Sequence, residues 1–499
     1  MRAGIVIVGH GPAAHRLVQL LRRYGYRGRI GVLGAEHRPA YQRPLLGEVL
    51  GGRLRPSALT LPGIAGDADV RDGVTVTGVD RRRALVHTDD GGSHPYDTLV
   101  LATGARPHLP DLPGLRAPDG SPAGGVTALR TLDDCLRIAP PPGTGPADAG
   151  GGGGRGPDVA VLGAGVLGVE TAVALRGGGR GVTLVHPAPH PMENRLDATA
   201  GLLLTERLER LGVRVLPGRT ARAYRPGALL LEDGEQVPAR HLVVCAGAVP
   251  ETSLARGCGL AVRTGVVVDA ELRTSDPRVR AIGDCAEYEG TVGGSVLTAW
   301  EQADVLARLL TGGGARFRGT RPAVRLRARE IDLAVLGTPD APGEEHPAGS
   351  ADEVVTFTDR TRGRYARLVL REGRVHGAVL LGLPRAIAAV AHLYDRDLPA
   401  PSDRLSLLLG TPPAGDPGGP AEDDVVCFCG GVTRAEVRRS WRDGARDLAA
   451  VAAATRATTG CGGCAREVLA LGGETHPGAA QPVDGGPRRL VGLLGEGGA

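Results

Sequence analysis

The sequence has no lysine, and only 3% of its residues are aromatic. All 59 basic residues are therefore arginines, and they are scattered among 55 acidic residues, which leaves a formal net charge of +4. No block of like charge stands out, which argues against a dedicated nucleic-acid surface. Because aromatic side chains are so few, the core must be built from Leu, Val, Ala and Ile, and 499 residues suffice for several domains.

Long apolar runs are also missing, and none approaches the length of a membrane span. The first residues, MRAGIVIVGHGP, enter a strand-like run without the charged, apolar and cleavage regions of a signal peptide. We therefore expect a cytoplasmic protein with no membrane association. Disulfides are rare in that compartment, which weakens a disulfide interpretation of the eight cysteines.

Two segments repeat the order of a buried strand, a glycine-rich turn and a helix. In the first, GIVIVGHGPAAHRLVQLLRRYG, a strand is expected from Ile5 to Val8, and aliphatic residues follow at helical spacing. The second, DVAVLGAGVLGVETAVALRGGGRGVTLVH, covers residues 158–186. Two such units so far apart predict two nucleotide-binding domains of the α/β class.

Composition divides the rest of the chain. Residues 139–157 are rich in Gly and Pro and cannot support a core, so they indicate a flexible insertion. Residues 320–409 alternate strand-like and helical segments, which predicts an α+β domain. Residues 410–424 form a linker, two cysteine pairs follow, and the glycine-rich end at 472–499 is expected to be disordered.

Each glycine loop has the spacing that suits a dinucleotide. The first glycine allows a tight turn, and the second lets a pyrophosphate approach the backbone at a helix N-terminus, whose dipole favours negative charge. The third position needs a small residue for close helix–strand packing. The first loop comprises Gly9, Gly11, Pro12, Ala13 and Ala14, and the second comprises Gly163, Gly165, Val166, Leu167, Gly168 and, two residues on, Glu170.

The acid that would bind the ribose hydroxyls should follow the second strand of each unit. Glu36 is the candidate in the first unit, with a solvated loop carboxylate as the alternative. In the second unit the strand ends in His186, and we expect the next acid, Glu193, to lie too far along the chain. The residue that usually favours NAD over NADP is therefore missing. His190 and Arg195 could contact a 2′-phosphate or could be ordinary loop residues.

Three further segments, LVLATGARPHLP, LVVCAGAVPE and VRAIGDCAE, follow in order around these loops. Together they resemble the pyridine nucleotide–disulfide oxidoreductases, in which the first loop binds FAD and an inserted domain binds NAD(P)H. The resemblance implies that Asp284 hydrogen-bonds a ribityl hydroxyl of the flavin. It implies cofactor contacts at Val76, Thr103, Gly104, His186, Gly247, Gly283 and Asp284.

Within that family, GAEHRPAYQRPLL resembles the branch of rubredoxin and ferredoxin reductases, which implies that Arg43 approaches FAD. The first of two acids common in that branch is Ala35 here, and Glu48 replaces a common basic residue. VTLVHPAPHPMENRLDATAG and ARLVLREGRVHGAVLLG resemble the flavoprotein part of NAD(P)H nitrite reductase large subunits and of the electron-transfer subunit of assimilatory nitrate reductase. The similarity extends to about residue 470.

Cys427-x-Cys429 and Cys461-x-x-Cys464 are the only closely spaced cysteines. Four thiolates suit either tetrahedral zinc or a [2Fe–2S] cluster, and the spacing does not separate them. The surrounding sequence, VCFCGGVTRAEVRRSWRDG and TTGCGGC, resembles the bacterioferritin-associated ferredoxin-like (BFD-like) domain, which implies [2Fe–2S]. TRAEVRRSW predicts a helix capped by Thr433 and Glu436, and TTGCGGCAREVLAL predicts another.

The expected fold class is α/β with two Rossmann-like three-layer domains, an α+β C-terminal reductase domain and a small helical [2Fe–2S] domain. The FAD domain is expected at 1–138 and 249–315, the NAD(P) domain at 158–248 and the [2Fe–2S] domain at 425–471. The remaining cysteines, Cys135, Cys245, Cys258 and Cys285, are isolated in sequence and are expected to be ordinary buried residues, which argues against dithiol chemistry beside the flavin.

This set of groups suggests an electron path. NAD(P)H gives two electrons as a hydride, a cluster accepts one at a time, and FAD can connect the two. We expect the nicotinamide to stack near Glu170 and a helix at Trp300–Leu310 to direct its N-terminus at the flavin. Trp300 either shields that ring or is a core aromatic.

We expect an NAD(P)H-dependent FAD/[2Fe–2S] oxidoreductase that serves a molybdenum nitrate reductase subunit or a separate nitrite reductase. No cysteine follows Cys464, so the chain is expected to lack the siroheme module of a self-contained nitrite reductase. Alternatives are a flavoprotein subunit of an opine- or amine-type dehydrogenase, a ferredoxin or rubredoxin reductase, and a redox-sensing or iron-transfer protein. A homodimer is compatible with each.

Overall fold

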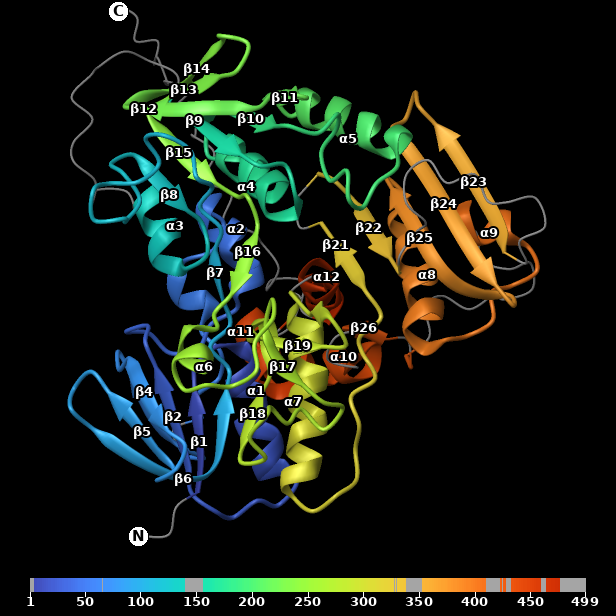
Figure 1. Ribbon diagram of the computed structural model, residues 1–499. Coiled ribbons are helices and arrows are strands. Elements are labelled where there is room, and N and C mark those ends of the chain that lie inside the picture. The colour runs from blue at the N-terminus through green and yellow to red at the C-terminus, as the bar shows by residue number, and fades with distance from the viewer. Residues whose placement is uncertain are drawn as a thin grey trace, which may run out of the picture. The chain divides into compact units, whose positions relative to one another are not determined.

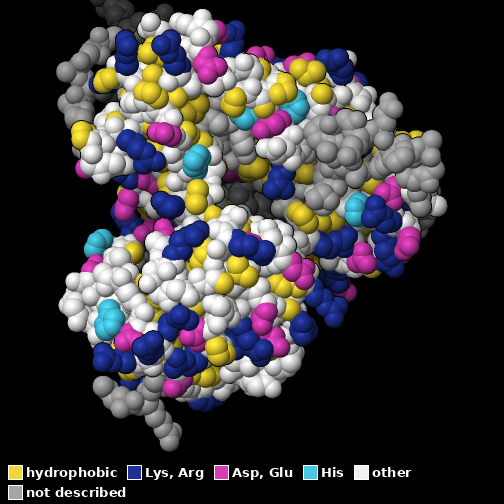
Figure 2. All heavy atoms as spheres, viewed as in Figure 1, with side chains coloured by type: hydrophobic (Ala, Val, Ile, Leu, Met, Phe, Trp, Pro, Cys, Tyr) yellow, Lys and Arg dark blue, Asp and Glu magenta, His cyan; other side chains and the backbone are white. Residues whose placement is uncertain are grey.

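The computed structural model describes residues 4–64, 66–139, 156–326, 328, 330–337, 352–409, 422–423, 425–427, 432–458 and 464–475. The chain forms two compact units, Met1–Pro417 and Gly418–Ala499. In the described part of the chain, no helix is long and apolar enough to cross a membrane. Figure 2 shows arginine and carboxylate side chains interspersed over the visible face, as expected from the scattered charges of the sequence.

The first sheet of the larger unit has the strand order β3-β2-β1-β6-β5-β4, and β18 pairs with β6 (Figure 1). Strands β3, β2, β1, β6 and β18 are parallel, whereas β4 and β5 form an antiparallel extension. Helices α1 and α7 pack against each other beside this sheet. The bounds are β1 Gly4–Val8, α1 Pro12–Arg23, β2 Ile30–Gly34, β3 Asp69–Asp72, β4 Val76–Asp80, β5 Leu85–Thr88, β6 Ser93–Leu101, β18 Val279–Ala281 and α7 Val296–Leu310.

The second sheet is fully parallel, with the order β11-β10-β9-β15-β8. A small antiparallel sheet, β12-β13-β14, packs with it in one core. The bounds are β8 Val126–Ala128, α3 Leu132–Ile138, β9 Gly156–Leu162, α4 Val166–Gly177, β10 Arg180–His186, α5 Ala198–Arg210, β11 Val213–Pro217, β12 Ala221–Arg225, β13 Gly227–Leu231, β14 Gln236–Ala239 and β15 His241–Val244.

Two predicted boundaries of this domain are wrong. We placed residues 1–138 in the FAD domain, but β8 pairs with β15 and so belongs to the second sheet. We also placed residues 139–157 in the insertion, but β9 already begins at Gly156. Residues 140–155 of the insertion lie outside the described residues.

Short elements connect the two sheets and complete the first domain. Strands β7 and β16 pair where the chain crosses between the domains, and β17, β19 and β20 form a small sheet before α7. The bounds are α2 Leu46–Leu50, β7 Ala105–Pro107, β16 Ala248–Pro250, α6 Ser253–Gly257, β17 Val266–Val268, β19 Ala286–Tyr288 and β20 Thr291–Val292, with 3₁₀ turns at Arg43–Leu45, Pro56–Leu59 and Gly283–Cys285.

The C-terminal part of the larger unit is an antiparallel sheet, β21-β22-β25-β24-β23, covered by α8 (Figure 1). Alternating aliphatic residues of β24 and β25 pack with the apolar face of α8 in one core. This is the predicted α+β arrangement. The bounds are β21 Ala323–Arg325, β22 Leu333–Leu336, β23 Glu353–Asp359, β24 Arg364–Arg371, β25 Arg374–Leu381, α8 Pro384–Arg396 and α9 Arg404–Leu409.

In its described residues, the smaller unit contains a short hairpin and three helices around the buried Trp441, whose indole N–H donates to the carbonyl of Val468 at 3.1 Å. Thr433 and Glu436 form the predicted capping box of α10. Helix α12 extends to Thr475, and Gly472 packs against the Trp441 ring, so a disordered tail beginning at residue 472 is wrong. The bounds are β26 Val425–Cys427, β27 Val432–Thr433, α10 Arg434–Arg442, α11 Leu448–Thr455 and α12 Ala465–Thr475.

Candidate functional site

The first glycine loop joins β1 to α1 at the carboxyl end of the parallel strands. Gly9 has φ +105°, and a Cβ there would overlap the carbonyl oxygen of Ala102. At Gly11, by contrast, a Cβ would meet no atom within 4 Å. The glycine at position 9 is thus required by the fold, whereas the one at position 11 leaves open space beside the helix N-terminus. Ala13 and Ala14 are buried, and Pro12 occupies the first turn.

The second glycine loop repeats this geometry between β9 and α4. Gly163 has φ +102°, and a Cβ there would lie 2.5 Å from the carbonyl oxygen of Cys245. A Cβ on Gly168 would overlap the Gly163 carbonyl, which is the close packing expected of the third position. Gly165 again has open space. Beside it, Val166 is partly buried and Leu167 is 37% exposed.

Neither glycine-loop helix has a side-chain cap, a feature that they share with α2, α6 and α8. Helices α1 and α4 begin at Gly11 and Gly165 without any side-chain cap. Helices α3, α5 and α7 each begin with a side chain, of Thr131, Asp197 or Ser295, that accepts from a first-turn N–H. The first-turn N–H groups of α1 and α4 therefore lack a side-chain acceptor, as an anion site at a helix N-terminus requires.

The Ala-Thr-Gly segment after β6 lies beside the first loop. The Thr103 hydroxyl donates to the Glu251 carbonyl at 2.7 Å, and the N–H of Glu251 donates to the Gly104 carbonyl at 2.9 Å. The equivalent Gly247 after β15 has φ +103°. Strands β7 and β16, which follow these two glycines, pair with Ala105 opposite Pro250. The two interdomain crossings are thus tied to each other.

The Gly-Asp turn after β18 is fixed from two sides. The Gly283 N–H donates to Gln302 Oε1 at 2.7 Å, and a Cβ on Gly283 would lie 3.2 Å from Ala13 Cβ. Arg130 Nη2 lies 2.5 Å from Asp284 Oδ2. Neither Gln302 nor Arg130 is among the site residues predicted from the sequence. Gln302 lies in a helix that was expected, but nothing in the sequence pairs either residue with the turn.

Glu36 and Arg43 were predicted separately and lie together. The Glu36 carboxylate forms an ion pair with Arg43 and accepts a 2.8 Å hydrogen bond from the Tyr41 hydroxyl. Arg43 also lies over the Tyr41 ring, 4.9 Å from its centroid. Both Glu36 oxygens are thus bonded within this three-residue network, while the side chain stays 31% exposed. Glu48, which replaces a basic residue, forms an ion pair with Arg53 at 2.6 Å.

Two polar atoms beside the first loop and α1 are buried without a hydrogen-bond partner in the described structure: His10 Nε2 and Trp300 Nε1. The other nitrogen of His10, Nδ1, lies 2.6 Å from Asp72 at the end of β3. Unpaired buried polar atoms are costly. Together with the open space at Gly11, they fit a polar ligand such as FAD at this loop.

Helix α7 begins at Val296 and not at Trp300 as predicted, because Ser295 caps it by accepting from the Thr298 N–H at 3.1 Å. Trp300 is partly buried and lies under the Arg16 guanidinium, 5.2 Å from the ring centroid. It is not among the fully buried core residues, so the core-aromatic alternative is not supported. Val76 begins β4, two residues after Val74, whose N–H donates to the Gly34 carbonyl at the end of β2.

The prediction that Glu193 lies too far from the second loop is wrong. Its carboxylate lies 2.6 Å from His186 Nε2, at the end of β10. His186 Nδ1 accepts from the Ala164 N–H at 3.3 Å, within the glycine loop itself. His190, a candidate for a 2′-phosphate, is 6% exposed and packs against Gly201. Glu170 is 7% exposed within α4.

Of the four predicted cluster ligands, Cys427 and Cys464 are described, and Cys429 and Cys461 lie outside the described residues. Cys427 ends β26, and Cys464 immediately precedes α12. Both belong to the core around Trp441, with Cys427 fully buried and Cys464 8% exposed. Two thiols far apart in sequence thus belong to one apolar core, and Cys464 lies at a helix N-terminus, which fits a cysteine-ligated cluster.

The four isolated cysteines are free. Burial raises the pKa of the Cys135 thiol to about 12 and, likewise, that of Cys245 to about 12. Burial also raises the pKa of Cys285 and Cys258. Thiols of this kind are poor nucleophiles at neutral pH, so the expectation of ordinary buried residues without dithiol chemistry agrees with their surroundings.

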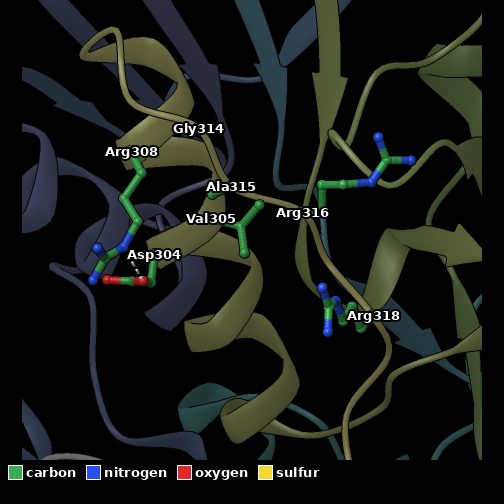
Figure 3. Close-up of a pocket in the computed structure, with 7 residues that line it drawn as sticks. All are labelled: Asp304, Val305, Arg308, Gly314, Ala315, Arg316 and Arg318. Carbon is green, nitrogen blue, oxygen red and sulfur yellow. Dashed lines mark hydrogen bonds and ion pairs between the residues drawn. The ribbon is translucent and has the colours of Figure 1, made fainter.

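A cavity of about 590 Å³ lies elsewhere, beside the C-terminal half of α7 (Figure 3). Asp304 and Arg308 point toward each other in it, 2.7 Å apart, while Arg316 and Arg318 come from the segment that follows the helix. Its lining contains none of the predicted cofactor residues. This cavity is therefore separate from the candidate site.

Comparison with known proteins defines the class. The family model described as pyridine nucleotide-disulphide oxidoreductase matches residues 3–303, and the BFD-like [2Fe-2S] binding domain matches residues 425–471. The chain therefore belongs to the pyridine nucleotide-disulphide oxidoreductases. It is an NAD(P)H-dependent oxidoreductase whose cofactors are FAD, NAD(P)H and a [2Fe–2S] cluster. The predicted family, fold class and cofactors are confirmed.

Individual relatives show which members of this family the chain resembles. The nitrite reductase NAD(P)H large subunit of Klebsiella oxytoca is 31% identical over 92% of this chain and 48% of the relative. The assimilatory nitrate reductase electron transfer subunit of Bacillus subtilis (strain 168) is 28% identical over 92% of this chain and 58% of the relative. The chain thus spans about half the length of these relatives. The covalent putidaredoxin reductase–putidaredoxin complex matches with a TM-score of 0.67 and 25% identity, covering 82% of this chain and 93% of that chain.

Proposed function

We propose that this protein takes electrons from NAD(P)H and passes them through FAD and its [2Fe–2S] cluster to a partner, as an electron-transfer component of assimilatory nitrate or nitrite reduction. The observation that carries the proposal is the extent of the likeness. It covers 92% of the chain in relatives named for nitrite reduction and for electron transfer to nitrate reductase.

In this proposal the first loop and α1 hold the FAD pyrophosphate. The space at Gly11 and the uncapped helix N-terminus support that role. Asp284, positioned by Arg130 and by the Gly283–Gln302 hydrogen bond, would hold the ribityl chain. When bound, FAD accepts a hydride and releases electrons singly, which is the chemistry needed between a nicotinamide and a cluster.

The second loop and α4 would hold NAD(P)H. The space at Gly165 and the uncapped N-terminus of α4 support contact with a nucleotide there. Cys427 and Cys464, with Cys429 and Cys461, would hold the cluster. The buried positions of the two described cysteines would exclude water from its sulfur ligands.

The half-reactions can be tested separately. Anaerobic NADH or NADPH should bleach the flavin and then produce the electron paramagnetic resonance signal of a reduced cluster. A Cys464→Ser variant should keep flavin bleaching but lose the cluster signal and delivery to a co-purifying molybdenum subunit. Cys258→Ser, a partly buried thiol outside the site, is the matched control. Failure of both nucleotides to bleach the flavin refutes the proposal, as does delivery that survives in Cys464→Ser.

A second candidate is a reductase that serves a separate ferredoxin. The likeness to putidaredoxin reductase in complex with putidaredoxin favours it. In that case Cys464→Ser should still reduce an added [2Fe–2S] ferredoxin at an undiminished rate. Reduction that depends on Cys464 would instead support transfer through the chain's own cluster.

A further inference from the structure

The segment after β10 is held against the second glycine loop by its backbone. The Met192 N–H donates to the Ala164 carbonyl at 2.9 Å, and Met192 adopts φ +57° with its side chain 2% exposed. The Leu196 N–H then donates back to the Met192 carbonyl at 2.9 Å. This turn brings Glu193, seven residues beyond the strand end, back to that end.

Side-chain hydrogen bonds fix the Glu193 carboxylate there. The Ala164 N–H can only donate, so His186 Nδ1 is the acceptor, and in the neutral ring Nε2 carries the proton that points at Glu193 Oε2, 2.6 Å away. His186 is 8% exposed, whereas the Glu193 side chain is 27% exposed. Glu193 Oε1 accepts a hydrogen bond from the exposed Asn194 amide at 3.0 Å. A hydroxyl of a bound ligand can therefore reach the carboxylate.

Two of the nearby basic side chains are already paired or buried. The Arg219 N–H donates to the His186 carbonyl at 2.9 Å, but the Arg219 guanidinium forms an ion pair with Asp233. His190 is buried against α5. Arg195 is exposed, two residues beyond Glu193. The Glu193 carboxylate is thus the acidic group that directly contacts the end of β10.

We propose that Glu193, positioned by His186, takes the role of the missing strand-end acid and selects NADH over NADPH. A carboxylate at the carboxyl end of the second strand accepts from the ribose 2′-hydroxyl of NAD, whereas NADP requires a cation for its 2′-phosphate. A 2′-phosphate here would meet a like charge, which disfavours the wrong ligand. The inference rests on NAD(P)H binding at the second loop and is independent of the electron acceptor.

Two ligands that differ only in the 2′-phosphate test it: ADP-ribose and 2′-phospho-ADP-ribose. Their dissociation constants with the oxidised, flavin-loaded full chain are measured by calorimetry, without electron transfer. Wild type should bind ADP-ribose at least about tenfold more tightly. Glu193→Gln keeps the shape and should narrow this ratio by at least about fivefold, mainly by tighter binding of the phosphorylated ligand.

Two control variants test whether the ratio of the two dissociation constants depends on the charge of Glu193 itself or on any nearby charge. Glu209→Gln removes an exposed carboxylate from α5 of the same domain and should leave the ratio unchanged. Arg195→Ala should also leave it unchanged, because Arg195 is not assigned to the ribose. A wild-type preference for the phosphorylated ligand, an unchanged ratio in Glu193→Gln, or a large effect of Arg195→Ala would each overturn the inference. These outcomes leave the proposed electron path untouched, since no acceptor is present.

Discussion

A single added methyl group should have different effects at the two glycines of the first loop. At Gly9 it should lower the stability of the fold, whereas at Gly11 it should lower the affinity for FAD. In Gly9→Ala, the new Cβ would lie 2.7 Å from the Ala102 carbonyl carbon, with the backbone at φ +105°. Left-handed backbone costs a non-glycine residue about 1–2 kcal/mol. Overpacking against backbone adds about 1–3 kcal/mol. A total near 3 kcal/mol lowers the unfolding midpoint of a domain of this size by roughly 6–12 °C.

In Gly11→Ala the fold should hardly change. Gly11 has φ −98° and ψ −173°, which alanine tolerates, and its Cβ would meet nothing within 4 Å. Alanine is a poorer N-cap than glycine by about 0.5–1 kcal/mol. Alanine also makes the unfolded chain less flexible, which stabilises the folded state by about 0.4–1 kcal/mol. The apoprotein should therefore melt within about 2 °C of wild type. The methyl would occupy the approach to the helix N-terminus, so FAD affinity should fall at least about tenfold.

The assay uses flavin-stripped protein, because bound FAD would itself raise the melting temperature. Calorimetric melting reports stability, and quenching of flavin fluorescence during titration reports FAD affinity. Gly31→Ala is the control, since Gly31 lies in β2 of the same sheet and its Cβ would also meet nothing. The reasoning fails if Gly11→Ala binds FAD like wild type, or if Gly9→Ala melts like wild type.

Three further perturbations test other parts of the molecule. Arg130→Ala removes the partner of Asp284 and should weaken FAD binding in the same titration; an unchanged affinity would deny Arg130 a positioning role. With pKa values raised to about 12 by burial, Cys135 and Cys245 carry only about 10⁻⁴ thiolate at pH 8 and should react with Ellman's reagent only after denaturation; rapid labelling of the native protein would contradict their burial. Trp441→Ala should cost the smaller unit about 3–5 kcal/mol and lose cluster absorbance, while the melting transition of the larger unit stays in place; a shift of both transitions would show that the units do not unfold independently.

The features that the sequence predicted best are those whose requirements are local. Gly9 and Gly163 each follow a buried strand directly. Both have a positive φ, which the tight turn into the next helix requires. The capping box of α10 is equally local, because Thr433 and Glu436 satisfy each other within one turn. Such patterns need no knowledge of distant partners.

Pairings between distant segments were not predictable in this way. Strand β8 has three residues, and its place in the second sheet depends on β15, far along the chain. Arg130, just beyond β8, meets Asp284 only because the domains fold across the β7–β16 crossing. A single sequence carries no signal for either contact.

The nucleotide sites show the same limit more sharply, since sequence distance from a strand end is a poor measure of spatial distance. Glu193 was set aside for its position in the sequence, yet the turn at Met192 returns it to the end of β10. In the first domain, Asp72 comes from a different strand to meet His10 within the glycine loop. Each loop therefore has a histidine–carboxylate pair beside it. In each pair, the carboxylate comes from a residue that does not directly follow the second strand, where a ribose-binding acid is expected. An acid missing from that position in the sequence cannot by itself indicate a preference for NADPH.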